Sequence, residues 1–280
     1  ADISVVNSLP MVLNAGGIDF DLSRDGRWLT LVGEDYDETT LVSRMLMFVF
    51  EFDEASIQLK QYGETVVLGT NEAAENWAAF DIDIEDSGAY VIASRIGEGE
   101  FLGFISVYEK GDNQWIQVGD SFTSFIQDDG FGQDVEVLVS PSQGAMVGFS
   151  APYRDLVYVY ALDVSTDQWS LVGSPISALD VLNTRGGNEF GFDIAFSSDG
   201  TILVIGAPSY QGRSGAVQAL SFLRGDWLPY GPTLGGYPDS SFGETVECSI
   251  DCSVMAIGAP MECWVEGCGG AVYIFRADAA

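Results

Sequence analysis

The sequence predicts an all-β protein built from five copies of one repeated unit. Three segments share the same pattern: FGQDVEVLVSPSQGAMVGFSAP (131–152), FGFDIAFSSDGTILVIGAP (190–208) and FGETVECSIDCSVMAIGAP (242–260). Two looser copies lie at 17–33 and 79–94. Each copy reads as a strand, a tight turn with glycine near its tip, and a second strand. A repeat of this period is typical of arrays built from similar β-sheets.

Each unit continues with a third strand rich in β-formers and a short fourth strand that ends in glycine. The third strands are expected at 45–53, 103–110, 156–164, 215–223 and 270–276. The fourth strands carry the segments IQLKQYG, QWIQVG, QWSLVG and DWLPYG. Trp115, Trp169 and Trp227 recur at one place in these segments, which predicts packing between units. Each unit therefore holds four strands in about 52 to 62 residues.

The fifth unit lacks a fourth strand, whereas the N-terminal segment 3–10 (ISVVNSLP) reads as a strand without a unit. The economical arrangement is a ring in which this strand completes the last sheet and leaves no open edge. The fold class predicted is thus a five-bladed β-propeller of four-stranded blades in a single domain. The expected blades are 18–77, 78–130, 131–189, 190–241, and 242–280 together with 1–10.

The pattern FGxxV, S-x-D-G, GAP and W-x-x-(V/L)-G resembles the FG-GAP repeats of integrin-α-type propellers. It is especially similar to tandem repeats of secreted bacterial and algal proteins. The resemblance covers nearly the whole chain and is loose in the first two units. The calcium loops of that family carry alternating oxygen ligands, D-x-(D/N)-x-D-G. The matching turns here, SRDG (23–26), EDSG (85–88), SPSQG (140–144), SSDG (197–200) and SIDC (249–252), lack three such ligands, so these sites are not carried over.

Charge and composition exclude several function classes. The chain has 42 acidic and 11 basic residues, a formal charge of −31, and no histidine. We expect no nucleic-acid partner and no direct membrane insertion, because this surface repels phosphates and no apolar run is long enough. The absence of histidine removes Ser-His and Cys-His nucleophiles and histidine metal sites.

All four cysteines lie within 21 residues: Cys248, Cys252, Cys263 and Cys268. Two local disulfides, Cys248 with Cys252 and Cys263 with Cys268, are the favoured interpretation, with a four-thiolate zinc site as the alternative. Disulfides imply an oxidising compartment, so we expect a secreted or lumenal protein.

Carboxylates at equivalent positions are the candidate site. Alignment of the first strands brings together Asp19, Asp81, Asp134 and Asp193, with Thr245 in the fifth unit. Two residues on, and hence on the same face, are Asp21, Asp83, Glu136, Ala195 and Glu247. If these strands are innermost, the carboxylates line a central channel. They could hold a cation such as calcium, act as an acid pair, or accept hydrogen bonds from backbone amides of the next blade.

A second acidic cluster, Glu34-Asp35-Tyr36-Asp37-Glu38, is expected in the loop between two strands of the first unit. Asp35 and Asp37 could bind a hard cation there, although a solvated loop is the simpler interpretation.

The function predicted is a non-catalytic binding or scaffold module that presents a blade-end surface to a protein or glycan partner, with no cofactor, or calcium in the channel. The alternative is a glycoside hydrolase-like enzyme that uses the channel carboxylates, as arabinanases and levansucrases of five blades do. Against the alternative, a nearly symmetric ring offers no reason for one carboxylate to differ in pKa from another.

Overall fold

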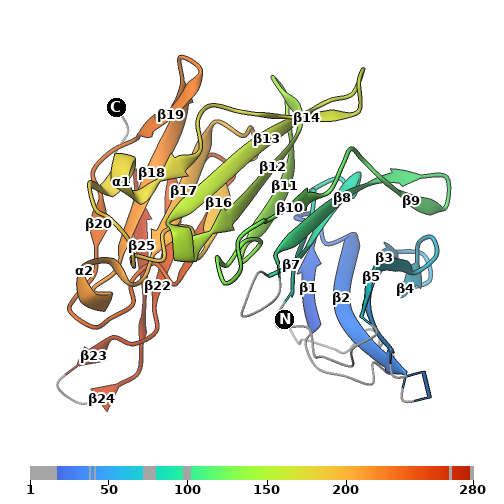
Figure 1. The fold of residues 1–280 in the computed structure, drawn as a ribbon, viewed down its shortest axis with the longest axis horizontal. Coiled ribbons are helices and arrows are strands. Elements are labelled where there is room, and N and C mark those ends of the chain that lie inside the picture. The colour runs from blue at the N-terminus through green and yellow to red at the C-terminus, as the bar shows by residue number, and fades with distance from the viewer. Residues whose placement is uncertain are drawn as a thin grey trace.

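The computed structural model describes residues 18–37, 39–40, 42–71, 80–96, 102–264 and 267–277. Within them, five antiparallel sheets follow one another along the chain, from the blue sheet through the green to the red one in Figure 1. The predicted N-terminal strand, residues 3–10, lies outside the described residues. No helix of the described part has the length and apolar character needed to cross a membrane.

The first four sheets contain five strands each. The first has β1 (Ile18–Leu22), β2 (Trp28–Asp37), β3 (Val42–Asp53), β4 (Gln58–Gln61) and β5 (Val66–Asn71). The second has β6 (Phe80–Ile84), β7 (Tyr90–Arg95), β8 (Phe104–Gly111), β9 (Gln114–Gln117) and β10 (Phe122–Thr123). The third has β11 (Val135–Ser140), β12 (Gly144–Ala151), β13 (Leu156–Asp163), β14 (Gln168–Leu171) and β15 (Ile176–Ser177). The fourth has β16 (Ile194–Phe196), β17 (Ile202–Ala207), β18 (Ala216–Leu223), β19 (Asp226–Pro229) and β20 (Leu234–Gly235).

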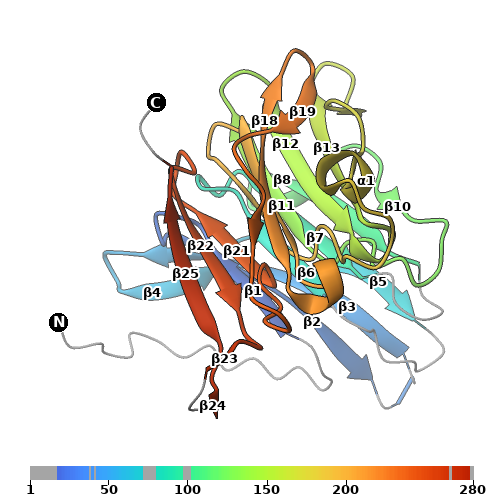
Figure 2. The ribbon, with the colours of Figure 1, turned by 90° about the vertical axis from the view of Figure 1, so that its left-hand side faces the viewer.

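The last sheet has three strands among the described residues, β21 (Thr245–Cys248), β22 (Val254–Ala259) and β25 (Ala271–Arg276). A separate hairpin of β23 (Cys263–Trp264) and β24 (Gly267–Cys268) projects from it (Figure 2). The helices are short: η1 (Pro152–Arg154), α1 (Ala178–Leu182) and α2 (Tyr210–Arg213). The all-β prediction is therefore confirmed.

The prediction of four strands per sheet is wrong for the first four sheets, which have five strands each. In the third sheet, the short β14 pairs only with residues 160–163 of β13, and β15 pairs with Leu156 and Val157 at its other end. The long third strand thus has room on one edge for two short partners, and the fourth sheet repeats this arrangement.

The acidic cluster at 34–38 is not a loop as far as the structure describes it. Asp35 and Asp37 belong to β2 and lie opposite Arg44 and Val42 of β3. The Asp35 carboxylate forms an ion pair with the Arg44 guanidinium at 2.5 Å. The Asp37 carboxylate accepts a hydrogen bond from the Thr39 amide at 2.8 Å. An arginine opposite the acidic run lets the strand continue where a loop was expected.

Tryptophan joins one sheet to the next, as predicted. The indole N–H of Trp115 donates to the carbonyl of Tyr62, that of Trp169 to Val118, and that of Trp227 to Val172, at 3.0 to 3.3 Å. The indole rings also explain the glycine at the end of each fourth-strand segment. A Cβ on Gly119 would lie 2.6 Å from the Trp169 ring, and one on Gly173 would lie 3.1 Å from the Trp227 ring. The repeated Trp and Gly are therefore two halves of one contact between neighbouring sheets.

The serine-containing turns are held by their own side chains. In the fourth sheet, Ser197 Oγ donates to Asp199 Oδ1 at 2.7 Å and accepts from the Ile202 amide at 2.9 Å. The same bonds recur around Ser23 in the first sheet and around Ser249 in the last. Gly200 then takes a φ of +69° to reverse the chain. The S-x-D-G pattern is thus a hairpin turn that is closed by hydrogen bonds of its own serine side chain.

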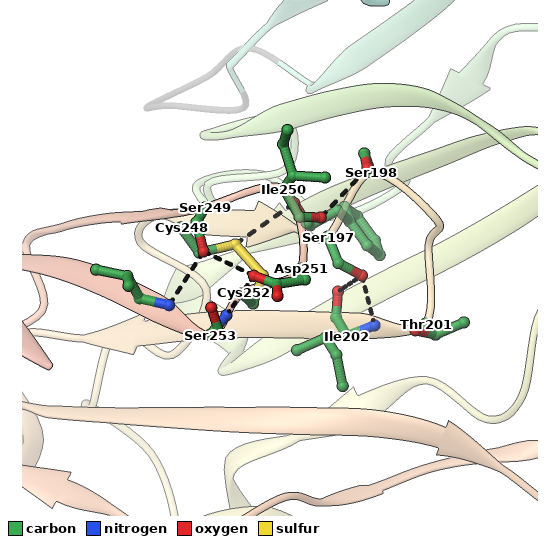
Figure 3. The surroundings of a disulfide bond; sticks show 12 residues. Ser197, Ser198, Thr201, Ile202, Cys248, Ser249, Ile250, Asp251, Cys252 and Ser253 are labelled. Carbon is green, nitrogen blue, oxygen red and sulfur yellow. Dashed lines mark hydrogen bonds between the residues drawn. A yellow bond between two sulfur atoms is a disulfide. The ribbon is translucent and has the colours of Figure 1, made fainter. Parts of the chain in front are cut away.

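Cysteine replaces glycine at the tip of the last turn (Figure 3). Cys252 has a φ of +49°, in the place of Gly200, and is disulfide-bonded to Cys248 on β21. A second disulfide joins Cys263 to Cys268 across β23 and β24. Both predicted disulfide pairs are confirmed, and they are consistent with an oxidising compartment.

Replacing the buried serine of the fourth-sheet turn should destabilise the protein. Ser197→Ala removes the acceptor of the Ile202 amide, so we expect a loss of about 1–3 kcal/mol in the free energy of unfolding, measured by denaturant titration. The neighbouring Ser198→Ala is the matched control, because the Ser198 hydroxyl makes an exposed bond to the Ile250 carbonyl and the substitution keeps the bond from the Ser198 amide to that carbonyl. Equal losses of unfolding free energy in the two variants would show that the Ser197 hydrogen bonds do not stabilise the turn.

Candidate functional site

Two rows of carboxylates run across the first strands of neighbouring sheets. The first row consists of Asp19 on β1, Asp81 on β6, and Asp134 and Asp193, which directly precede β11 and β16. The second row consists of Asp21, Asp83, Glu136 and Glu247, on β1, β6, β11 and β21. Thr245 and Ala195 take the fifth place in the two rows. The structure therefore brings together all eight carboxylates that the alignment of the repeats singled out.

The carboxylates of the first row bind the backbone of the next sheet. The Val135 amide donates to Asp81 Oδ2 at 2.6 Å, the Ile194 amide to Asp134 Oδ2 at 2.5 Å, and the Val246 amide to Asp193 Oδ2 at 2.5 Å. A carboxyl group can accept such a bond on one oxygen whether it is ionised or protonated. The first row thus ties each first strand to its neighbour, which is one of the three interpretations drawn from the sequence.

The second row repeats this bonding one step along the strands. Asp21 accepts from the Ile84 amide at 3.1 Å, Asp83 from Val137 at 2.6 Å, and Glu136 from Phe196 at 3.0 Å. The fourth sheet breaks the row, since Ala195 has no side chain to reach β21. Glu247 also differs, since the amide that acts on its carboxylate and lowers its pKa is that of the adjacent Cys248.

Crowding of these acids favours their protonated forms. Burial raises the pKa of Asp81 to about 8, with a further contribution from the hydrogen bond and charge of Asp19. Burial also raises the pKa of Asp193 to about 6, against the lowering effect of the Val246 amide. The pKa values of Asp83, Asp134 and Glu136 lie well above their ordinary values, first because of burial and then because of neighbouring carboxylates. Protons are therefore part of this structure near neutral pH.

A cavity of about 290 Å³ opens where the first strands turn into the hairpins. Its polar lining residues include Asp21, Asp83, Glu136 and Glu247 of the second row together with Arg24, Asp86 and Ser198 of the turns. Arg24 forms an ion pair with Asp86 at 3.3 Å, with both side chains about half exposed. The volume is near the lower end of small-molecule sites, which suits a ligand of monosaccharide size.

Two carboxyls of the cavity have distinct environments. Glu136 is half-buried, and burial together with the charge of Glu247 raises its pKa well above the ordinary value. Glu247 keeps part of its side chain exposed; burial and the Asp21 charge raise its pKa, while Arg24 lowers it. The expectation that a symmetric ring would make the carboxylates alike is wrong, because Ala195, Arg24 and Glu247 break the symmetry. Pairs of acids in unequal environments are typical of acid–base sites.

The carboxylates of both predicted cation sites are engaged in contacts within the protein. Asp19, Asp81, Asp134 and Asp193 are adjacent, but the oxygens described for the last three already accept amide bonds. Asp35 and Asp37 are engaged in β2 and its turn. Among the described ranges, no group of three or more acidic or cysteine side chains has an arrangement that could hold a metal ion. Calcium at either place stays a prediction.

Sequence reasoning located the second row but missed the side chains that close the cavity. Arg24 and Asp86 occupy the variable position of the S-x-D-G turn, which looks like an ordinary surface site in a sequence. The signal that could have found them is the turn's place in the fold, since the hairpin tips of all units meet at the same end of the first strands.

Comparison with known proteins establishes the fold. A proposed 6-phosphogluconolactonase of Bacteroides fragilis is 15% identical with a TM-score of 0.54, over 94% of this chain and 67% of that chain. The periplasmic gluconolactonase of Pseudomonas aeruginosa is 16% identical with a TM-score of 0.56, over 85% and 63%. Hydrazine synthase of Kuenenia stuttgartiensis is 10% identical with a TM-score of 0.51, over 92% and 82%. No protein-family model and no curated protein match the sequence.

The chain is thus an all-β protein with a propeller-like fold, and it spans about two thirds of the two lactonases named above. The prediction of a non-catalytic binding or scaffold module is contradicted, because the neighbours of this fold include sugar-lactone enzymes. The error arose from treating the carboxylates as equivalent. The alternative, an enzyme with channel carboxylates, is the better supported of the two interpretations.

The buried acids predict that stability falls as pH rises. A carboxyl whose pKa is higher in the folded protein than in the unfolded chain stabilises the fold below its ordinary pKa of about 4 and loses this effect as pH passes the folded value. For Asp81 the window therefore runs from about 4 to about 8. We expect the melting temperature to fall between pH 5 and pH 9, and to fall less in Asp81→Asn, which keeps an acceptor oxygen for Val135.

The matched control for this experiment is Asp163→Asn. Asp163 is exposed, and hydrogen bonds from Ser165 lower its pKa, so it titrates below the window. This variant should keep the wild-type slope. If Asp81→Asn and the wild type lose stability equally from pH 5 to pH 9 at constant ionic strength, the proton at Asp81 is not part of the fold.

Proposed function

We propose that the protein is a hydrolase that opens a small sugar lactone in the cavity lined by the second row of carboxylates. The observation that carries the proposal is the unequal pair Glu136 and Glu247, from two different sheets, in one cavity of about 290 Å³. The names of the two lactonases with the same fold support this substrate class.

Hydrolysis of a lactone needs a base and an acid. The Glu247 carboxylate takes a proton from water, and the water oxygen adds to the lactone carbonyl carbon. The ring C–O bond then breaks, and the ring oxygen takes the proton of the Glu136 carboxyl, so that lactone and water give the hydroxy acid. Raised pKa values suit both roles, because general acids and bases work best near the ambient pH.

A hydrogen bond and a difference in exposure support these roles. The Phe196 amide occupies Oε2 of Glu136, which leaves Oε1 to carry the proton. Glu247 is the more exposed of the two and has Arg24 in its surroundings, which favours its ionised form. Arg24 is also the cationic group of the cavity lining, so it is placed to stabilise negative charge on the carbonyl oxygen.

Removal of the base should abolish most activity. We expect Glu247→Gln to lower kcat for glucono-1,5-lactone by about 100-fold or more, the usual contribution of general acid–base catalysis. The measurement is acid release followed with a pH indicator, corrected for spontaneous hydrolysis.

The matched control is Glu64→Gln, an exposed residue between β4 and β5, which should keep wild-type kcat. Wild-type protein without lactonase activity would overturn the proposal. Release of reducing sugar from polysaccharides by that inactive protein would support a glycoside hydrolase instead.

The charge of the cavity predicts a preference for neutral substrates. Among the residues that the structure describes, its lining holds six carboxyl groups and one cation, Arg24; the carboxyl groups are those of Asp21, Asp83, Glu85, Asp86, Glu136 and Glu247. A phosphorylated lactone would bring a dianion into this field, on a chain whose net charge is −31. We expect kcat/KM for glucono-1,5-lactone to exceed that for its 6-phosphate by at least about 100-fold. Equal or reversed values would show that the cavity charge does not govern selection.

We further propose the finer fold assignment: FG-GAP-like repeats, five blades, and completion of the last blade by residues 3–10. The five successive sheets and the third strand β25, which has one edge open among the described residues, support it. A single domain, secretion or a lumenal location, and a protein or glycan partner with no nucleic acid remain predictions beside it.

A further inference from the structure

The two disulfides of the last unit differ in how far solvent reaches them. Cys252 is 5% exposed and packs in the hydrophobic core between the fourth and last sheets, and Cys248 is half-buried beside it. Figure 3 shows this pair next to the fourth-sheet turn that carries Ser198. Cys263 and Cys268, in contrast, are both exposed. A sulfur that solvent reaches is open to attack by a dissolved thiol, whereas a buried one is inert.

Charge adds to this difference at the buried pair. The nucleophile in thiol–disulfide exchange is a thiolate anion, which negative charge repels. Cys248 lines the acidic cavity described above, whose described lining holds six carboxyl groups and one arginine. A thiolate that approached Cys248 through this cavity would enter that negative field. Both burial and charge therefore protect the Cys248–Cys252 bond from thiols.

The exposed pair lies on a hairpin that belongs to none of the five sheets. Cys263 of β23 stands directly opposite Cys268 of β24. Among the described strands, β23 and β24 pair only with each other. Figure 2 shows the hairpin projecting from the last sheet. Opening of the Cys263–Cys268 bond therefore breaks no strand pairing within the five sheets.

Hydrogen bonds hold the base of this hairpin independently of the disulfide. The Glu262 amide donates to the Ala259 carbonyl at 3.2 Å, and the Gly270 amide donates to the Glu262 carbonyl at 3.1 Å. Glu262 is 3% exposed, and the Tyr273 hydroxyl donates to its carboxylate at 2.6 Å. These bonds keep the two ends of the hairpin together after the S–S bond opens. The two cysteines thus stay at a high effective concentration and can form their bond again.

We propose that Cys263–Cys268 is a site of reversible thiol–disulfide exchange that takes a small neutral or cationic thiol, independently of the lactonase activity proposed above. A thiolate attacks one sulfur of the pair, a new S–S bond forms to that sulfur, and the bond between the two cysteines breaks. The other cysteine leaves as a thiolate and takes up the proton that the attacking thiol released.

This step transfers no net electrons, and attack by the freed cysteine on the mixed disulfide restores the original bond. The charge of the chain sets the ligand class. A net charge of −31 repels thiols that carry an additional negative group. The Cys248–Cys252 bond, in contrast, is a structural cross-link.

The two disulfides of one molecule serve as site and control in the same experiment. The folded protein is treated with cysteamine at mildly alkaline pH without oxygen, samples are acidified, and freed thiols are alkylated and located by peptide mass mapping. We expect Cys263–Cys268 to open at least about tenfold faster than Cys248–Cys252, because a buried disulfide reacts only after local opening. The cysteamine adduct should lie on Cys263 or Cys268, and the circular dichroism of the sheets should stay unchanged during this fast phase.

Paired substitutions assign the fast phase to one disulfide. Cys263→Ser with Cys268→Ser should abolish it, because both exposed sulfurs are removed while the hydrogen bonds of the hairpin base remain. Cys248→Ser with Cys252→Gly is the matched control, and it should keep the fast phase. Glycine suits that position, because Gly200 has the same left-handed backbone in the turn of the fourth sheet.

Two thiols of similar size and opposite charge test the ligand class. Cysteamine is cationic and mercaptoethanesulfonate is anionic, and their rates are compared at equal thiolate concentration. We expect cysteamine to open Cys263–Cys268 at least about threefold faster at low ionic strength, with a smaller ratio in high salt, because salt screens the repulsion. An equal or reversed preference overturns the ligand class.

Three results overturn the exchange site itself. The first is opening of Cys248–Cys252 as fast as that of Cys263–Cys268, or faster. The second is a fast phase that persists after both exposed cysteines are replaced by serine. The third is a fast phase that coincides with loss of the circular dichroism of the sheets, since unfolding and not exposure in the folded protein would then admit the thiol.

Discussion

Hydrogen bonds from the backbone amides of one first strand to the carboxylates of the preceding one hold the interior of this protein together. The first strands β1, β6, β11, β16 and β21 lie in five different sheets, so they do not pair with one another through backbone hydrogen bonds. Side chains must therefore connect them. Asp81, Asp134 and Asp193 do this in one row, and Asp21, Asp83 and Glu136 in the other. A carboxylate can accept a bond from a neighbouring sheet without requiring the two strands to share a ladder.

The same arrangement has an electrostatic cost. Acids packed in adjacent positions repel one another, and the low-dielectric surroundings strengthen that repulsion. Protonation relieves it, so the rows combine backbone anchoring with bound protons. The cavity at the end of the second row inherits both properties, since its acids are fixed by amides and their protonation depends on their neighbours. A site for acid–base chemistry can therefore arise from the interactions that assemble the fold.

Much of the fold could be predicted from the sequence, because residues that recur in each repeat indicate contacts between sheets as well as the strands themselves. The recurrence of Trp115, Trp169 and Trp227 predicted contacts between sheets, and the indole bonds confirm it. The local spacing of the cysteines predicted both disulfides. The extra fifth strands, such as β15 and β20, were missed because two residues carry no periodic pattern. The strand through Asp35 was missed because its stability depends on Arg44 across the sheet.

The candidate site was harder to predict, since its chemistry depends on departures from the repeat. Alignment of the units placed all eight acids, but it could not rank them. Ala195 and Glu247 become distinctive only when the rows are seen in space, and Arg24 enters through a turn position that varies freely. Burial, which decides the pKa values, has no local signature in a chain with this many acids.

Both disulfides belong to the C-terminal end of the array, where the last sheet has the fewest strands among those described. Cross-links that close loops of four or five residues contribute about 2 kcal/mol each by the loop-closure estimate. The cysteines thus stabilise the last sheet from within, where it has the fewest strand partners. In a reducing environment this sheet would lose that contribution, so opening it would require less free energy than before, while the other four sheets, which hold no disulfide, would be unchanged.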